Sequence, residues 1–106
     1  MVFIHGGGFS TGSSDLSGPR RFMKHGIVLV TVNYRLGVFG FMSTGDEIIP
    51  GNFGALDVVT SLQWVQKHIQ DFGGNPRRVT LFGHSAGSAL VHTLLLSPRA
   101  LGNVHL

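Results

Sequence analysis

Three short apolar runs, each without regular polar alternation, divide the chain. They cover residues 1–4 (MVFI), 26–34 (GIVLVTVNY) and 78–83 (RVTLFG). Continuous apolar runs rich in β-branched residues are typical of strands that are covered on both faces, as in a parallel sheet. The hydrophobic pattern therefore predicts three buried, mostly parallel strands.

Helical periodicity separates these runs. Between residues 54 and 71, apolar side chains recur every three or four positions, at Leu56, Val59, Leu62, Val65 and Ile69. Gly73 and Gly74 close that segment. We expect a second helix over 86–97, ended by Pro98, and a short helix over 16–25. Alternating strands and helices predict an α/β fold with a mostly parallel sheet.

The composition indicates that the chain is part of a larger domain. Hydrophobic residues make up 42% of the sequence and charged residues only 12%, against about 25% in an average globular protein. Three such apolar strands would also leave exposed edges if they formed the whole sheet. We therefore expect the sheet to be incomplete within these 106 residues.

Charge and cysteine content narrow the function classes. The net charge is +3, but basic residues adjoin only at Arg20-Arg21 and Arg77-Arg78, without interleaved aromatic residues, so no nucleic-acid partner is expected. The apolar run GIVLVTV is far shorter than the ~20 residues of a membrane helix, and no signal peptide is recognisable at the start. With no cysteine and no zinc-type ligand spacing, we expect neither a metal nor a cofactor.

Two glycine-rich motifs follow two of the predicted strands. HGGGF (5–9) comes after the first and GHSAG (83–87) after the third. The carboxyl ends of parallel strands share one edge of a sheet, where ligands bind. A G-x-S-x-G motif there would place Ser85 on a sharp turn and direct the N–H of Ala86 toward the same space, joined by the N–H groups of Gly7 and Gly8.

Each motif has a simpler interpretation when taken alone. G-x-S-x-G also occurs in ordinary strand-to-helix turns, and three glycines often form a flexible or phosphate-binding loop. The P-loop and dinucleotide-binding patterns are both absent from the sequence. Taken together, and each after a predicted strand, the two motifs predict an acyl-transfer site with Ser85 as nucleophile.

The sequence resembles the type-B carboxylesterase and cholinesterase family. VFIHGGGF, NYRLGVFGF, GNFGALD, LQWVQKHI and FGGNPRRVTLFGHSAGS follow in the family's order and spacing, and LLLSPRALG extends the likeness to about residue 102. The resemblance implies that residues 1–106 are part of an α/β-hydrolase domain, with Ser85 as nucleophile and Gly7, Gly8 and Ala86 as the oxyanion hole. It also implies a small carboxylic ester as substrate and no cofactor. It favours the secretory pathway, whereas the sequence itself leaves localisation open.

Some positions depart from the family pattern. His84 stands where glutamate is common, a variant that we associate with insect-type esterases. The usual glutamine is missing after Asp57, Asn75 replaces the usual aspartate, and the chain ends in GNVHL where a more apolar stretch is usual. None of these changes affects the nucleophile or the oxyanion donors, but His84 changes the polarity beside Ser85.

None of the six histidines is expected to be the catalytic base. His5 is predicted to support the loop, His84 cannot turn back onto Ser85 within the elbow, and His92 is expected to be a surface or packed residue. We interpret the others as ordinary loop, helix-end and terminal residues: His25, His68 and His105.

The acid of a catalytic triad is missing as well. In α/β-hydrolases the acid and the histidine follow the serine along the chain, but no Asp or Glu follows Ser85. The family's acid and base lie in a C-terminal part, so we expect the 106-residue chain alone to be inactive. For Asp57 we favour an ion pair with Arg35 over a catalytic role. A non-catalytic esterase-like adhesion module and a truncated gene product are the alternative functions.

Overall fold

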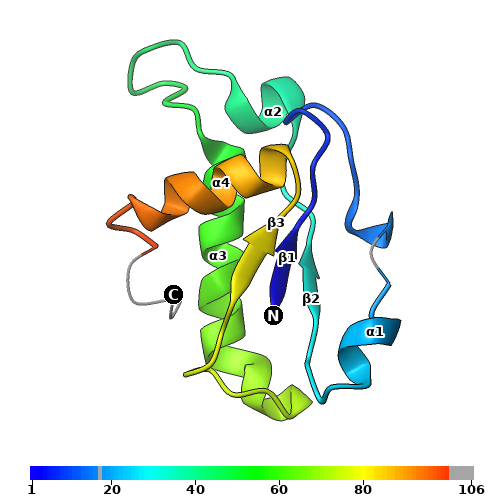
Figure 1. Cartoon of the computed structure of the whole chain (residues 1–106). Coiled ribbons are helices and arrows are strands. Elements are labelled where there is room, and N and C mark those ends of the chain that lie inside the picture. The colour runs from blue at the N-terminus through cyan, green and yellow to red at the C-terminus, as the bar shows by residue number, and fades with distance from the viewer. Residues whose placement is uncertain (17, 101–106) are drawn as a thin grey trace.

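The computed structural model describes residues 1–16 and 18–100. Strands and helices alternate along it, as Figure 1 shows. The elements are β1 (Val2–Ile4), the 3-10 helix η1 (Ser14–Leu16), α1 (Arg20–Met23), β2 (Val30–Val32), α2 (Gly37–Phe41), α3 (Phe53–His68), the 3-10 helix η2 (Ile69–Phe72), β3 (Leu81–Gly83) and α4 (Ala86–Leu95).

The three strands form one parallel sheet in the order β2-β1-β3, which confirms the predicted α/β arrangement. Val2 aligns with Val30 and Leu81, and Ile4 aligns with Val32 and Gly83. Because β2 and β3 each pair only with β1 among the described residues, both keep a free outer edge. The open edges agree with the expectation that the sheet is incomplete.

The strands are shorter than the sequence predicted. The apolar run 26–34 yields only Val30–Val32, and the run 78–83 yields only Leu81–Gly83. The ladder is limited by β1, because its three residues are what both neighbours pair with in the described part of the chain. Single hydrogen bonds continue the pairing beyond the strands, from the N–H of Val2 to the carbonyl of Thr80 (2.8 Å) and from the N–H of Val30 to the carbonyl of Met1 (2.9 Å).

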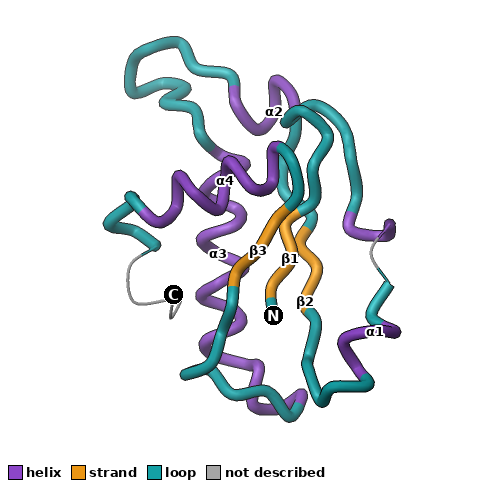
Figure 2. Tube along the Cα trace, viewed as in Figure 1, coloured by secondary structure: helices purple, strands orange, loops and turns teal. Residues whose placement is uncertain are grey.

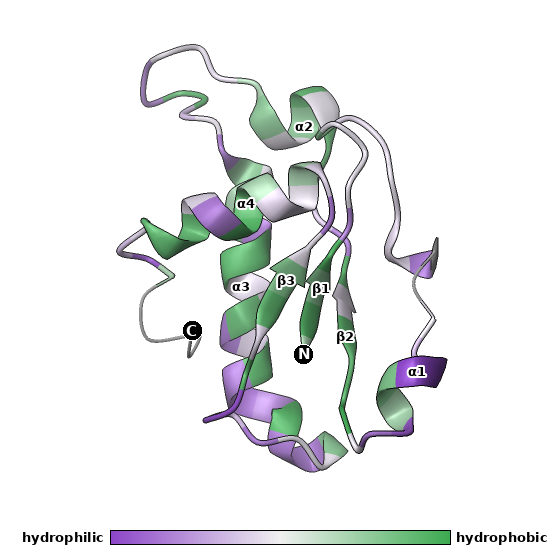
Figure 3. Cartoon of the chain, viewed as in Figure 1, coloured by the Kyte–Doolittle hydropathy of each residue, from purple (hydrophilic) through white to green (hydrophobic). Residues whose placement is uncertain are grey.

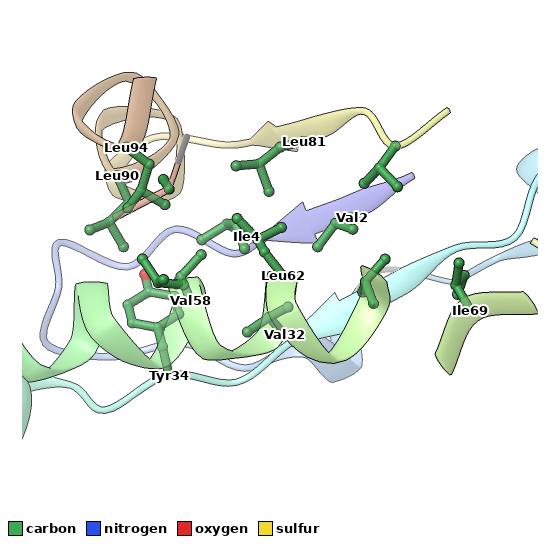
Figure 4. Close-up of a cluster of buried hydrophobic side chains, with 14 residues drawn as sticks. Val2, Ile4, Val32, Tyr34, Val58, Leu62, Ile69, Leu81, Leu90 and Leu94 are labelled. Carbon is green, nitrogen blue, oxygen red and sulfur yellow. The ribbon is translucent and has the colours of Figure 1, made fainter. Parts of the chain in front are cut away.

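The helix predicted over 54–71 is α3, which continues as the 3-10 turn η2 up to Gly73. Its buried face consists of Val58, Val59, Leu62 and Val65. Leu56, expected on that face, is only half-buried, and Val58 takes its place against the sheet. Figure 4 shows Val58 and Leu62 facing Ile4.

Two further helices differ from the expected pattern. The segment 16–25 contains α1 together with the end of η1, rather than one helix. Helix α2 lies within what the sequence indicated to be a long loop, and its five residues include two glycines, so periodicity could not reveal it. Helix α4 ends at Leu95, close to the predicted end at 97, and crosses α3 near the carboxyl ends of the strands (Figure 1).

The two faces of the sheet are covered unequally. Val2 and Ile4 are almost fully buried against α3. On the other face, Phe3 packs against Phe82 (ring centroids 5.1 Å apart, tilted by 47°), and Phe22 of α1 contacts Phe82 (5.9 Å). Phe3 and Phe82 stay partly exposed, so burial on both faces is not reached within the described residues. Figure 3 shows apolar residues along all three strands.

Candidate active site

Ser85 occupies the turn between β3 and α4. Its backbone has φ 54° and ψ −122°, a region that residues with a side chain rarely adopt. Such a conformation costs about 1–3 kcal/mol and persists only where the surroundings enforce it. The Ser85 side chain is exposed at this strained position, as expected for a nucleophile elbow.

The two glycines of the motif make the turn possible. A Cβ on Gly83 would lie 2.5 Å from the carbonyl carbon of Gly87, and a Cβ on Gly87 would overlap the carbonyl oxygen of Ile4. Strand β1 and helix α4 therefore approach so closely that no side chain fits between them. Glycine at both positions is therefore what the sharp turn predicted for this motif requires.

The loop after β1 lies directly against this elbow. A Cβ on Gly6 would lie 3.0 Å from the Cβ of Ser85, and the N–H of His84 donates to the carbonyl of Ile4 (3.3 Å). The structure thus brings the two glycine-rich motifs together, although residues 10–82 lie between them along the chain. Figure 2 shows both loops beyond the carboxyl ends of the strands.

The backbone N–H groups expected to bind an oxyanion are unpaired within residues 1–16 and 18–100. Neither Gly7 nor Gly8 donates a hydrogen bond there. Ala86 is the first residue of α4, where helix geometry leaves the N–H without an intrahelical acceptor. Gly7 (φ 117°) and Gly8 (φ 61°) adopt left-handed conformations that favour glycine. The assignment of these three donors to an oxyanion stays a prediction.

The histidines lie largely as expected. His5 is 5% exposed, and its Nδ1 lies 2.7 Å from the carbonyl oxygen of Gly6. His92 is exposed on α4, and His25 is exposed in the loop before β2. No histidine ring hydrogen-bonds Ser85 in the described part of the chain. His105 lies outside the described residues.

Two cavities lie at opposite ends of the strands. One of about 420 Å³ lies beside the glycine-rich loop at 5–12, which we call the oxyanion loop. It is lined by Phe3, His5, Gly6, Gly7, Thr11, Gly12, Ser13 and His84. A larger one of about 710 Å³ lies at the amino ends of the strands, against Met1, Val28 and Arg78. The larger cavity contains none of the predicted site residues, whereas the smaller one is lined by Gly7 and by His84, the neighbour of Ser85. We therefore place the candidate site beside the smaller cavity, although Ser85 itself does not line it.

The predicted ion pair is present. Asp57 accepts hydrogen bonds from Nε and a terminal nitrogen of Arg35 (2.8 and 2.7 Å) and from the Arg35 backbone N–H (3.0 Å). The hydrogen bonds from Arg35 lower the pKa of the Asp57 carboxyl, and the same pairing raises the pKa of Arg35. Asn75 stabilises its own turn, since its Oδ1 accepts a hydrogen bond from the N–H of Arg77 (2.9 Å).

Residues that hold the oxyanion loop were missed by the sequence analysis. Tyr34 donates its hydroxyl to the carbonyl of His5 (2.8 Å), Asn33 accepts the N–H of Ser14 (2.9 Å), and the N–H of Gly37 donates to Phe9 (2.6 Å). All three belong to the segment 33–37. A signal existed, because this segment begins at the carboxyl end of the second predicted strand, 26–34, and so lies at the same end of the sheet as the two motifs.

The described residues offer little for other chemistry. They contain no group of three or more His, Asp or Glu side chains that could hold a metal ion. In the same part of the chain, no helix is long and apolar enough to span a membrane.

The chain is similar to known carboxylesterases along its whole length. The carboxylesterase family matches residues 1–106. Carboxylesterase 3B of Mus musculus is 53% identical over 106 residues, covering 99% of the chain and 19% of that protein. Juvenile hormone esterase of Tribolium castaneum is 55% identical over 104 residues, covering 96% of the chain and 18% of that protein. Insect and mammalian relatives match about equally, so these identities do not separate an insect-type subgroup.

A solved structure agrees in fold. The crystal structure of juvenile hormone esterase from Manduca sexta, with OTFP covalently attached, superposes with a TM-score of 0.92 at 50% identity. The match covers 96% of the present chain and 20% of the Manduca sexta esterase chain. The sequence therefore spans about one fifth of the length of its relatives. The predicted partial α/β-hydrolase fold is thereby confirmed, and the chain belongs to the carboxylesterase family.

Proposed function

We propose that residues 1–106 carry the nucleophile and the oxyanion hole of a serine carboxylesterase. The observation that carries this proposal is the strained backbone of Ser85, which is exposed and lies against Gly6 of the loop whose Gly7 and Gly8 N–H groups are unpaired among the described residues. The remainder of the hydrolase domain would supply the acid and the base. The substrate is a small carboxylic ester, and no cofactor takes part.

The reaction proceeds in two steps. Oγ of Ser85 attacks the ester carbonyl carbon, its proton passes to the histidine base, and the carbonyl π electrons move onto oxygen. The resulting oxyanion accepts hydrogen bonds from the N–H groups of Gly7, Gly8 and Ala86. The tetrahedral intermediate then expels the alcohol, which takes the proton from the base, and leaves acyl-Ser85. In the second step, water attacks the acyl carbonyl in the same way, and the carboxylic acid is released from Ser85.

The N-terminus of α4 supports this assignment electrostatically. Helix α4 begins at Ala86, immediately after the nucleophile, so the positive end of its dipole points at the developing negative charge. The donors belong to backbone already held by the fold, so little reorganisation is needed during the reaction. Donors of this kind typically contribute about 3–4 kcal/mol each to transition-state stabilisation.

The test is ester hydrolysis by the protein encoded by the complete reading frame around these residues. With a p-nitrophenyl ester, Ser85→Ala is expected to lower kcat by about 10⁴-fold or more. Ser88→Ala, an exposed serine on α4, serves as the matched control and is expected to retain activity. Absence of turnover in the wild-type protein, or equal turnover in Ser85→Ala, would overturn the proposal and favour the non-catalytic adhesion module.

The isolated 106-residue chain provides a second arm. It contains the nucleophile and the oxyanion donors but no acid after Ser85, so its turnover should be far below that of the complete protein. Turnover by the isolated chain at the rate of an intact esterase would contradict the proposed division of the site.

A further inference from the structure

The oxyanion loop needs external support to hold its donors in place. Gly7, Gly8, Phe9 and Gly12 all have positive φ. Glycine loses more conformational freedom on folding than other residues, and Phe9 adds the strain of a left-handed residue with a side chain. An oxyanion donor is effective only when its direction is fixed before reaction. The contacts that fix this loop therefore bear directly on the proposed function, on which this inference rests.

Peptide planarity links each donor to the carbonyl that precedes it. The N–H of Gly7 shares a trans peptide plane with the carbonyl of Gly6, and the two groups point in opposite directions. Nδ1 of His5 lies 2.7 Å from the Gly6 carbonyl oxygen. Since a carbonyl oxygen only accepts, Nδ1 carries the proton and donates it. The His5 ring thereby fixes the direction of the Gly7 N–H.

Tyr34 in turn holds His5 at two points. The two rings stack with centroids 4.6 Å apart at 19°, and the Tyr34 hydroxyl donates to the His5 carbonyl at 2.8 Å. Both side chains are buried, Tyr34 at 6% and His5 at 5% exposure. Figure 4 shows Tyr34 among the core side chains, and burial raises the pKa of its hydroxyl, which keeps it protonated as a donor.

The surroundings leave the His5 ring little freedom. Gly12 lies against its Nδ1 and Cε1 atoms, since a Cβ on Gly12 would lie 2.5 Å from Nδ1 of His5 and 2.8 Å from Cε1. The position of Tyr34 is also fixed, because the backbone N–H of its neighbour Arg35 donates to Asp57 on α3. A continuous set of contacts therefore runs from α3 through Tyr34 and His5 to the Gly7 donor.

We propose that Tyr34 is a positioning residue for the oxyanion hole, acting through the carbonyl and ring of His5 on the N–H of Gly7. Tyr34 has no contact with the reacting atoms, so its effect is on transition-state stabilisation and not on ground-state binding. Loss of its hydroxyl leaves the stacked ring in place and removes one restraint from the peptide next to the glycine loop.

The experiment uses the complete protein and two matched ketones. An aryl trifluoromethyl ketone forms a hemiketal with Ser85 and places negative charge in the oxyanion hole, whereas the corresponding methyl ketone binds without that charge. For Tyr34→Phe we expect kcat and the affinity for the trifluoromethyl ketone to fall by about 10-fold. This is less than the loss expected when one oxyanion-hole donor is removed entirely, because the Gly7 N–H is misaligned and not lost. KM and the affinity for the methyl ketone should not change.

Val65→Ala is the control for a general loss of stability. Val65 is buried in α3 and lies outside the loop, so this variant should lower Tm and leave the ratio of the two ketone affinities unchanged. An unchanged ratio in Tyr34→Phe, or a ratio that shifts equally in Val65→Ala, would contradict the positioning role. Wild-type protein without turnover would instead overturn the proposed function itself.

A second variant keeps the inference testable if Tyr34→Phe does not fold. His5→Phe retains an aromatic ring and removes the Nδ1 donor, so it should lower the affinity for the trifluoromethyl ketone by a similar factor. Where Tyr34→Phe does fold, the double variant should lose little more affinity than either single variant, because the two residues act in series. Losses that multiply would show that Tyr34 acts independently of His5, contrary to the proposal.

Discussion

The two halves of the candidate site are held in place in different ways. The elbow at 83–87 is fixed by backbone contact with its neighbours, since Cβ atoms on Gly83 and Gly87 would collide with main-chain atoms. The oxyanion loop at 5–12 is fixed mainly by hydrogen bonds, from its own Thr11 and from the distant Tyr34 and Gly37. The elbow therefore depends on its glycines alone. The loop also needs glycine, since Cβ atoms on Gly7 and Gly12 would collide with main-chain oxygens, but it depends in addition on hydrogen bonds from distant residues.

This difference predicts how each half tolerates change. A group added to the elbow must displace β1 or α4, which are parts of the core, so the whole fold responds. A group removed from the support of the loop leaves the core intact and changes only how well the donors are aligned. Substitutions in the elbow should thus act on stability, and substitutions around the loop should act on catalysis.

The largest effect is expected from Gly87→Ala. Its Cβ would overlap the carbonyl oxygen of Ile4 and lie 2.6 Å from that of His5, so strand and helix must separate. We expect a loss of about 3 kcal/mol or more in the free energy of unfolding of the complete protein, together with loss of esterase activity. Urea denaturation measures the first effect.

The matched control for that variant is Gly18→Ala. Gly18 has no positive φ, and a Cβ added to it would meet no atom of the described residues within 4 Å, so the free energy of unfolding should change little. If both alanine variants were equally stable, close backbone contact could not be what fixes the elbow.

A smaller effect is expected from Asp57→Asn, which weakens the anchor of the segment 33–37. Arg35 lowers the pKa of Asp57 below its ordinary value of 3.8, so the folded state favours the ionised carboxylate. The resulting stabilisation is fully present above pH 3.8 and is lost as pH falls through the lowered pKa. Wild-type Tm should exceed that of the variant by a few degrees at pH 7, and the gap should narrow at acidic pH. A gap independent of pH would contradict this account.

The smallest effect is expected from Thr11→Val. The carbonyl of Gly7, which sets the direction of the Gly8 N–H, accepts the Thr11 hydroxyl (3.2 Å) but also the N–H groups of Ser10 and Thr11 (3.1 and 3.0 Å). Because two of the three donors remain, kcat should fall by no more than about 3-fold, within the roughly 0.5–1.5 kcal/mol of one typical hydrogen bond. A loss as large as that of Tyr34→Phe would show that redundancy does not protect the Gly8 donor.

The elbow could be predicted from the sequence because its determinants are local. Gly83, Ser85 and Gly87 lie within five residues, and the close contacts that they require follow from the strand-to-helix turn itself. The sequence also predicted the pairing of Arg35 with Asp57, where opposite charges stand beside a helix start. The positions of the strands followed from apolar runs, but their lengths depended on the short partner β1.

The support of the oxyanion loop could not be predicted in the same way. Tyr34 and His5 are 29 residues apart, and no periodicity or motif links a tyrosine hydroxyl to one backbone carbonyl. Helix α2 was missed because its two glycines break any apolar periodicity, and Val58 was missed because α3 turns a slightly different face to the sheet. These features arise from tertiary contacts, which are set only once the sheet edge has formed.

The most direct test of Ser85 as the nucleophile is to locate the site of covalent labelling in the complete protein. A fluorophosphonate reacts with an activated serine by forming a phosphorus–oxygen bond and releasing fluoride, and peptide mass spectrometry locates the adduct. We expect one adduct, on the peptide that contains Ser85, and none in Ser85→Ala. An adduct on another serine, or labelling that persists in Ser85→Ala, would contradict the assignment of Ser85 as the nucleophile.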